Sequence, residues 1–292
     1  MRFATFNHQG RRQVGQLSVD GHTVTALDIP AAPVERGMLA LIEQLAGGAA
    51  LPRPTGAALP LESVRLEAPI PVPRRNVWCV GRNYHAHAKE LQASVFKNNA
   101  TDTTAWPIFF TKAPETVVGP GDAVVLPGPD ISTQIDYEAE LTIVIGKGGK
   151  NIPREQAMKH VFGYTIINDV TARDVQMRHQ QWDLGKSFDT FCPMGPWIVT
   201  ADELDGRDTR VRCWVNGDLR QDAQTADLIF DLPSLIETCS RGITLYPGDL
   251  IATGSPAGVG MGMTPPRWLK AGDSVKVVID GLGELENRFS AG

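Results

Sequence analysis

Hydrophobic and polar positions alternate over several short stretches of the chain, and only a few stretches have helical spacing. Alternation is typical of strands buried on one face, and it occurs near the N-terminus at residues 2–6, 14–17 and 23–27. Helical spacing follows over residues 38–45 and stops at Gly47. The first part of the chain therefore predicts a small α+β subdomain, which we place at residues 1–68.

A proline-bearing stretch, residues 69–75, predicts an extended linker ahead of a larger domain at 69–292. In that domain short apolar runs outnumber helical ones, which indicates a β-rich α+β fold with mixed sheets and short helices. The polar stretch 92–106 and residues 184–190 are predicted to be loops. Strands are predicted at residues 76–81, 107–112, 135–146, 163–169, 211–216, 250–254 and 274–279, and helices at 84–91, 153–161, 233–241 and from 171 onward.

The predicted strand 135–146 is unusual because it begins with three acids on one face. Residues two apart in a strand share a face, so Asp136, Glu138 and Glu140 point the same way. The strand then continues into the largely apolar run 141–145, so we expect it to lead from a solvated end into a core that covers both of its faces. Carboxylates at such a point need a partner, and oxygen-only ligands favour Mg²⁺ or Mn²⁺, with Ca²⁺ as a further candidate. An acidic, solvated edge strand is the alternative interpretation.

Two further groups have residue types suited to catalysis. Asp169 follows an apolar strand and would be presented at its end, although an aspartate in that place also commonly forms a turn or caps a helix. His87 and Glu90 lie three residues apart in a predicted helix and share one of its faces. Such a pair is either a surface contact or a proton-transfer dyad, and spacing does not decide between them.

Composition narrows the classes of function. The 292 residues are 42% hydrophobic, which suits a globular protein with a full core, and the net charge of −5 argues against nucleic acid as a partner. We also expect no membrane span and no signal peptide. The four cysteines form no C-x-x-C pair, so we expect buried, reduced thiols in a cytoplasmic protein.

Five motifs follow one another along the larger domain. They are VGRNY at 80–84, DYEAEL at 136–141, NDVTARDVQ at 168–176, GKSFD at 185–189 and TGSP at 253–256. Each is weak by itself, but the five together are specific, and in order and spacing they resemble the fumarylacetoacetate hydrolase superfamily. The resemblance covers about residues 69–285, and the first 65 or so residues resemble the variable N-terminal piece of bacterial members.

The resemblance implies a mixed β-sandwich roll, a homodimer and a site with defined roles. Its acidic motifs assign Glu138, Glu140 and Asp169 to one Mg²⁺ or Mn²⁺, and similarity to acylpyruvases makes His87 and Glu90 a water-activating dyad on a lid helix. The long polar stretch 92–106 departs from the usual lid connection and bears on substrate choice. The remaining roles are oxyanion stabilisation by Lys186 and substrate binding by Arg82, Tyr84, Arg173, Gln176 and Thr253.

The leading hypothesis is therefore a metal-dependent hydrolase that cleaves a C–C bond in a 2,4-dioxo acid, such as an acylpyruvate or a diketo-deoxy sugar acid. Metal-stabilised enolate chemistry also serves decarboxylation of a β-oxo diacid such as oxaloacetate, which is the first alternative. A non-catalytic dimeric protein that retains the fold is the second. The sequence leaves the physiological substrate and the choice between Mg²⁺ and Mn²⁺ open.

Overall fold

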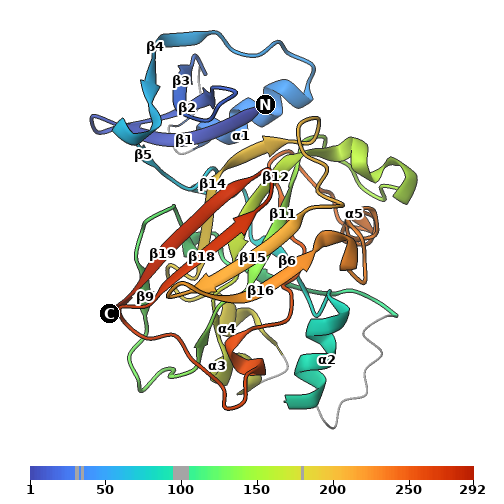
Figure 1. Ribbon diagram of the computed structural model, residues 1–292. Helices are drawn as coiled ribbons and strands as arrows, with labels where there is room; N and C mark the ends of the chain where they lie inside the picture. Colours follow the sequence, from blue (N-terminus) through green and yellow to red (C-terminus); the bar gives the residue numbers. More distant parts are fainter. Residues whose placement is uncertain (30–32, 34–35, 95–104, 179–180) are drawn as a thin grey trace.

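Two packed β-sheets form the body of the protein in a computed structural model that describes residues 1–29, 33, 36–94, 105–178 and 181–292. The N-terminal strands lie together at one end of the molecule, and helix α2 lies at the opposite end (Figure 1). The fold is the β-rich α+β arrangement with a small N-terminal subdomain that the sequence predicts. The domain boundary at residues 68 and 69 stays a prediction.

The larger sheet has twelve strands, ten of which follow the order β4-β3-β2-β1-β14-β12-β11-β17-β6-β7, while β5 pairs with β1 and β8 with β14. Its strands are β1 (Arg2–His8), β2 (Arg11–Leu17), β3 (Thr23–Leu27), β4 (Pro54–Pro60), β5 (Arg65–Leu66), β6 (Val77–Gly81), β7 (Ile108–Lys112), β8 (Val117–Val118), β11 (Ala139–Ile145), β12 (Val161–Asn168), β14 (Cys192–Thr200) and β17 (Leu250–Ala252).

A five-stranded sheet of order β16-β15-β18-β19-β9 packs against the middle of the larger one, and a short pair, β10 with β13, lies beside the site described below. Their strands are β9 (Val124–Leu126), β10 (Ile135–Asp136), β13 (Thr171–Ala172), β15 (Arg210–Val215), β16 (Asp218–Gln224), β18 (Ser274–Ile279) and β19 (Gly283–Ala291).

The helices are short and lie around the sheets. Asp231 caps α5 by accepting a hydrogen bond from Ser234 N at 3.0 Å, and a proline lies within the first turn of the helix. The α-helices are α1 (Gly37–Ala46), α2 (His85–Ser94), α3 (Arg173–Arg178), α4 (Asp183–Lys186) and α5 (Leu232–Ser240).

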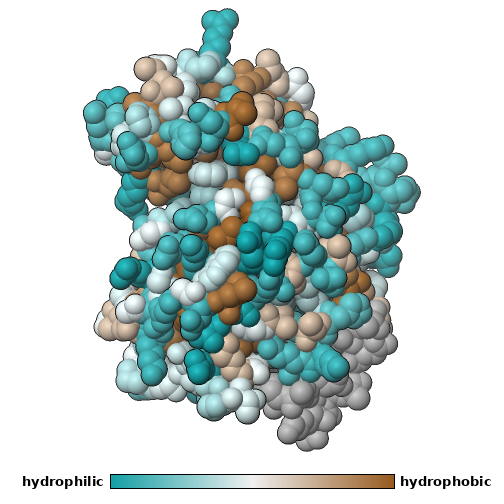
Figure 2. Space-filling model, viewed as in Figure 1, coloured by the Kyte–Doolittle hydropathy of each residue, from teal (hydrophilic) through white to brown (hydrophobic). Residues whose placement is uncertain are grey.

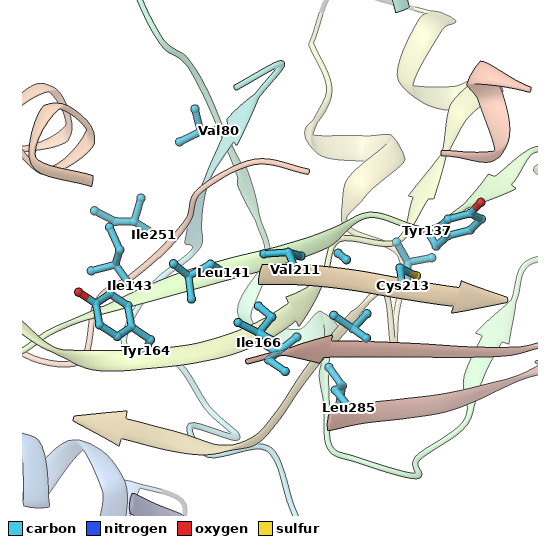
Figure 3. Close-up of a cluster of buried hydrophobic side chains, with 14 of the residues drawn as sticks. Val80, Tyr137, Leu141, Ile143, Tyr164, Ile166, Val211, Cys213, Ile251 and Leu285 are labelled. Carbon is cyan, nitrogen blue, oxygen red and sulfur yellow. The ribbon is translucent and has the colours of Figure 1, made fainter. Parts of the chain in front are cut away.

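The main core lies between the two sheets. Leu141 and Ile143 of β11 and Ile166 of β12 face Val211 and Leu285 of the smaller sheet (Figure 3). Every residue of β11 is buried, which confirms the prediction that the core covers both faces of this strand. A strand held on both faces and paired on both edges is a rigid support for side chains at its end.

The N-terminal subdomain continues the larger sheet. Strand β1 pairs antiparallel with β14, with Phe3 opposite Ile198, and α1 packs on the same side through Leu41 and Ile42. Figure 2 shows hydrophilic residues over most of the face in view, with hydrophobic ones scattered among them. No helix among the described residues is long and apolar enough to cross a membrane. All four cysteines are buried and free.

Several local predictions need correction. The strand predicted at 135–146 is broken, because β10 ends at Asp136 and β11 begins at Ala139. The helix predicted at 153–161 is a 3₁₀ helix, Arg154–His160, and the loop predicted at 184–190 begins with α4. Strands β14 and β16 were not predicted, because their sequences lack clear alternation. Strand β19 was not predicted because the polar Asn287 stands among its alternating buried positions, and β4, β5, β8 and β9 were not predicted either. Most of the stretch 92–106 lies outside the described residues.

Candidate metal centre and active site

Three carboxylates meet where β11 begins and β12 ends. The two strands are antiparallel, with Ala139 opposite Asn168, so Glu138 and Glu140 at the start of one strand lie beside Asp169 at the end of the other. Asp169 N also donates a hydrogen bond to the Glu138 carbonyl at 2.8 Å. One carboxylate oxygen from each of the three acids lies within 4.8 Å of the others, and all three residues are buried. Sheet register thus assembles the acids that the sequence presents separately.

Two buried lysines contact this cluster. The Lys186 ammonium bridges the carboxylates of Glu138 and Asp169, at 2.6 Å from the latter. Lys112, which sequence reasoning missed, lies 2.7 Å from the other Asp169 oxygen and also donates to the carbonyl of Val170 at 3.1 Å. Its position was detectable, since Lys112 shares the buried face of β7 with Phe110 and a lysine there requires an anionic partner.

A short helix brings Lys186 to the cluster. Asp183 at the start of α4 accepts a hydrogen bond from the backbone of Thr111 at 3.1 Å, and the Lys186 carbonyl accepts one from Lys112. A Cβ at Gly185 would lie 2.5 Å from Gln176 N, so glycine is needed for α3 and α4 to approach this closely. The glycine of the GKSFD motif therefore has a packing role beside the lysine.

The charges of the cluster are unequally balanced. Burial opposes ionisation of Glu138, but Arg173 and Lys186 outweigh it and lower its pKa. For Glu140, burial and then the nearby Asp169 and Glu138 raise the pKa well above its ordinary value. Burial opposes the charge of Lys186 as well, yet Asp169 and Glu138 raise the pKa of its ammonium, so it stays protonated. Glu140 is thus the carboxylate whose charge is least compensated.

Arg173 connects the cluster to a fourth buried acid. Its guanidinium donates to Glu138 at 2.7 Å, to Asp136 at 2.9 Å and to the Gln176 side chain at 3.1 Å. Asp136 is fully buried, so the expectation that the strand's first acid lies at a solvated end is wrong. The break after Asp136 turns this residue into the protein, where the guanidinium balances its charge.

His87 and Glu90 form the pair that their spacing predicts. His87 is 2% exposed, and its Nδ1 lies 3.1 Å from a Glu90 carboxylate oxygen. The turn ahead of α2 is anchored by Asn83, whose amide donates to the carbonyls of Thr253 at 2.8 Å and Phe230 at 3.0 Å. Glu90 contacts Nδ1 of the ring and His87 lines the cavity, so Nε2 is the ring nitrogen that this contact does not occupy.

Most of the predicted site residues line one cavity. Four of them are not part of its lining: Tyr84, Glu90, Asp169 and Thr253. Asp169 and Glu90 contact lining residues, Tyr84 is buried, and the Thr253 hydroxyl donates to the Leu141 carbonyl at 2.9 Å. The roles of Tyr84 and Thr253 in substrate binding stay predictions. Sequence reasoning missed Phe110, Trp182, Ser255 and Met261. The lining residues are Val80, Gly81, Arg82, His87, Phe110, Glu138, Glu140, Arg173, Gln176, Trp182, Lys186, Ser255 and Met261.

Comparison with family models identifies both parts of the chain. Residues 76–290 match the fumarylacetoacetate (FAA) hydrolase C-terminal model, and residues 1–69 match the Rv2993c-like N-terminal model. The chain belongs to the fumarylacetoacetate hydrolase family. With its buried acidic cluster, it is a metal-binding enzyme of that family.

The relatives of this chain include proteins that are named oxaloacetate tautomerase. The chain is 48% identical to oxaloacetate tautomerase YisK of Bacillus subtilis over 230 residues, which is 78% of this chain and 74% of the relative. It is 41% identical to the mitochondrial oxaloacetate tautomerase Fahd2a of Rattus norvegicus over 301 residues, which is 99% of this chain and 91% of the relative.

Solved structures of the family extend over the whole chain. A fumarylacetoacetate hydrolase from Exiguobacterium antarcticum is 39% identical with a TM-score of 0.83, and both chains are covered completely. A maleylpyruvate hydrolase from Sphingobium sp. SYK-6, solved with manganese(II) and pyruvate, is 35% identical with a TM-score of 0.79 and the same coverage.

Proposed function

We propose that the protein is a divalent-metal-dependent oxaloacetate tautomerase, an enzyme that interconverts the keto and enol forms of this acid. The observation that carries the proposal is the single cavity that joins buried carboxylates to Arg173, Lys186 and His87. The relatives named oxaloacetate tautomerase, one of them matched over 99% of this chain, direct the choice of substrate.

The acidic cluster fits a hard divalent cation. Glu138, Glu140 and Asp169 offer only carboxylate oxygens, the ligands that Mg²⁺ and Mn²⁺ prefer. The cations Arg173, Lys186 and Lys112 pair with Glu138 and Asp169, whereas Glu140 accepts a hydrogen bond from Gly254 N at 2.8 Å. A bound cation would therefore compensate the charge of Glu140. A bound cation would hold the carboxylate and 2-oxo oxygens of oxaloacetate and stabilise negative charge on the enolate oxygen.

The side chains of the cavity suit the proton transfers of tautomerisation. A proton leaves C3 of the keto form and another arrives at the 2-oxo oxygen, so the composition of the substrate is unchanged. His87, oriented through Nδ1 by Glu90, is placed to move the C3 proton with its other ring nitrogen. Lys186 stays protonated, so it supplies a charged hydrogen-bond donor where oxygen gains negative charge.

Gln176 and Arg82 line the same cavity and offer further donors for the substrate carboxylates. The Arg82 guanidinium stacks over Trp182 at 5.8 Å from the ring centroid, which holds it at the cavity wall. A substrate with two carboxylates suits a cavity that has cationic groups on both Lys186 and Arg82.

Hydrolysis of a C–C bond in a 2,4-dioxo acid is the second candidate. The His87–Glu90 pair favours it, because such a dyad can activate water, and the maleylpyruvate hydrolase structure shows that a chain of similar fold carries that name. Decarboxylation of oxaloacetate is the third, since it passes through the same enolate. The non-catalytic alternative loses support because the acids and lysine of the site are assembled and buried.

The experiment that separates these reactions supplies Mn²⁺ and follows the products. We expect the enol absorbance of oxaloacetate to relax faster with enzyme while no pyruvate accumulates. Pyruvate formed from oxaloacetate would identify a decarboxylase, and pyruvate plus a second acid formed from acylpyruvates would identify a hydrolase. Turnover of acylpyruvates with none of oxaloacetate would overturn the proposal.

The same assay tests His87. We expect His87→Ala to lower kcat about 10²- to 10⁴-fold, the range typical of general acid–base groups. His85→Ala is a matched control, because His85 lies on the same helix but is exposed to solvent. Wild-type kcat in His87→Ala would remove the dyad from the reaction.

Light scattering of the purified protein would test the expected homodimer.

A further inference from the structure

Asp136 has the contacts of a residue that holds other parts of the site in place. Its side chain is fully buried and accepts four hydrogen bonds. Its Oδ1 accepts from Gly260 N at 2.7 Å and from Tyr137 N at 2.9 Å, while its Oδ2 accepts from Met261 N at 3.0 Å and from Arg173 Nε at 2.9 Å. Every bond joins this carboxylate to a different backbone or side-chain group around the cavity.

The loop that Asp136 binds also supports the lid helix. We call residues 258–262 the glycine loop. Gly258 N donates to the Glu90 carboxylate at 3.1 Å, and the Gly258 carbonyl accepts from the Tyr137 hydroxyl at 2.7 Å. A Cβ at Gly262 would overlap the Glu90 carboxyl carbon, so the absence of a side chain there leaves room for Glu90. Asp136 and Tyr137, which are adjacent in the chain, thus both bind the glycine loop that contacts Glu90.

These contacts form two branches that start from one carboxylate. One branch passes through Gly260 and Met261 to Gly258, and from there to Glu90 and His87. The other passes through Arg173 to Glu138 of the acidic cluster. Asp136 itself is outside the cluster of possible metal ligands found among the described residues. Its charge is nevertheless needed, because all four groups that face it are hydrogen-bond donors.

We propose that Asp136 is a positioning residue that couples the two halves of the site: through the glycine loop it fixes the Glu90–His87 pair, and through Arg173 it fixes the guanidinium beside Glu138. The inference rests on the proposed function for its activity assay, but its structural readout does not. Asp136→Asn is the direct test, because it keeps the shape of the side chain and places an NH₂ group against donors.

We expect Asp136→Asn to lower kcat for oxaloacetate about 10- to 100-fold, the usual cost of removing a partner that orients a catalytic residue. Coupling is measured by combining it with Glu90→Gln. If Asp136 acts through Glu90, the double variant loses less activity than the product of the two single losses. If the product of the two single losses in kcat equals the loss in the double variant to within about twofold, the proposal is overturned.

Amide hydrogen exchange gives a readout that needs no substrate. We expect Asp136→Asn to raise exchange at residues 85–90 of α2 as well as in the glycine loop, while Asp122→Asn, a change in a distant turn, leaves both unchanged. Unchanged exchange in α2 would overturn the coupling. If the wild type fails to tautomerise oxaloacetate, the proposed function falls, but the exchange result still decides the coupling.

Two further variants cover the case in which Asp136→Asn does not fold. Asp136→Glu keeps the charge and shifts the carboxylate by one methylene. It would replace Asp136→Asn in the comparison with Glu90→Gln and the double variant. Gly262→Ala leaves Asp136 intact and displaces only the Glu90 carboxylate, the far end of a flexible side chain. We expect Gly262→Ala to lower kcat about tenfold and raise exchange in α2. If Gly262→Ala has wild-type kcat and wild-type exchange in α2, the contact between Glu90 and the glycine loop has no role in positioning Glu90.

Discussion

The acidic cluster and the His87–Glu90 pair both contribute residues to one cavity, but they are held in different ways. Glu138, Glu140 and Asp169 are positioned by the pairing of two central strands that are buried on both faces. The pair stands on α2, a helix at the edge of the molecule, and reaches the rest of the site through the contact of Glu90 with the glycine loop (Figure 1). Sheet register therefore fixes the cluster, whereas a few hydrogen bonds fix the pair.

The difference assigns separate tasks to the two regions. A rigid cluster suits a cation that requires fixed ligand geometry. A pair on a helix at the edge of the molecule, in contact with the glycine loop through Glu90, suits a group that must move to admit substrate and return to transfer a proton. Variants that affect one region and spare the other sharpen this comparison.

The largest effect is expected from the cluster. Glu140→Gln removes the carboxylate whose charge is least compensated, so we expect it to abolish Mn²⁺ binding and to lower activity by more than about 100-fold, beyond the cost of losing an orienting partner. Calorimetric titration with Mn²⁺ measures the first effect. Glu155→Gln, an exposed change, is the control. A wild-type Kd in Glu140→Gln would show that the cluster is not the metal site.

An intermediate effect is expected from Lys112→Met. This change leaves Asp169 with one ammonium partner in place of two, and breaking a buried pair typically costs about 3–5 kcal/mol of the free energy of unfolding. Urea denaturation measures the loss, with the exposed Lys270→Met as its control. Because the contact supports the cluster, amide exchange in α2 should stay unchanged. Faster amide exchange in α2 of Lys112→Met would show that the cluster and the His87–Glu90 pair are not supported independently.

The smallest effect is the pH dependence of stability in the metal-free protein. Burial and two neighbouring acids raise the pKa of Glu140, so its stabilising contribution is complete below the ordinary value near 4.5 and is lost as pH rises through the raised pKa. We expect the Tm of EDTA-treated wild type to fall more than that of Glu140→Gln as pH rises above 4.5. Equal slopes would contradict the raised pKa.

Added Mn²⁺ reverses that trend, since it binds the ionised carboxylate. At a concentration of 100 times Kd, a ligand specific for the folded state adds about 2.7 kcal/mol to the free energy of unfolding. The gain should be absent in Glu140→Gln, and His87→Ala should keep it. A loss of the gain in His87→Ala would break the distinction between the two regions.

Much of the fold could be predicted because its elements have local signals. Alternation identified β1 to β3, helical spacing identified α1, and the largely apolar run after Glu140 identified a strand buried on both faces. The break between β10 and β11 could not be predicted. Alternation continues through Tyr137, and only pairing with β13 and contact with the glycine loop end the first strand at Asp136.

The candidate site divides in the same way. Glu138, Glu140, Asp169, Lys186, His87 and Arg173 were all predicted, and the structure brings them around one cavity, although their roles stay predictions. Trp182 and Ser255 were missed, because each acquires its place only when separate strands and loops come together. Lys112 was missed although it shares one face of β7 with Phe110.

The sequence by itself determined several of the strands and helices, the family resemblance and the residue types of the acidic cluster, since these depend on side-chain chemistry and near neighbours along the chain. Only the tertiary structure decided the environment of Asp136. By sequence it is an acid at a solvated strand end, yet in the folded chain it is buried against Arg173 and the backbone of residues 260 and 261. The reason is physical: a carboxylate is tolerated in the core only when donors distant in sequence surround it, and local patterns do not record those donors.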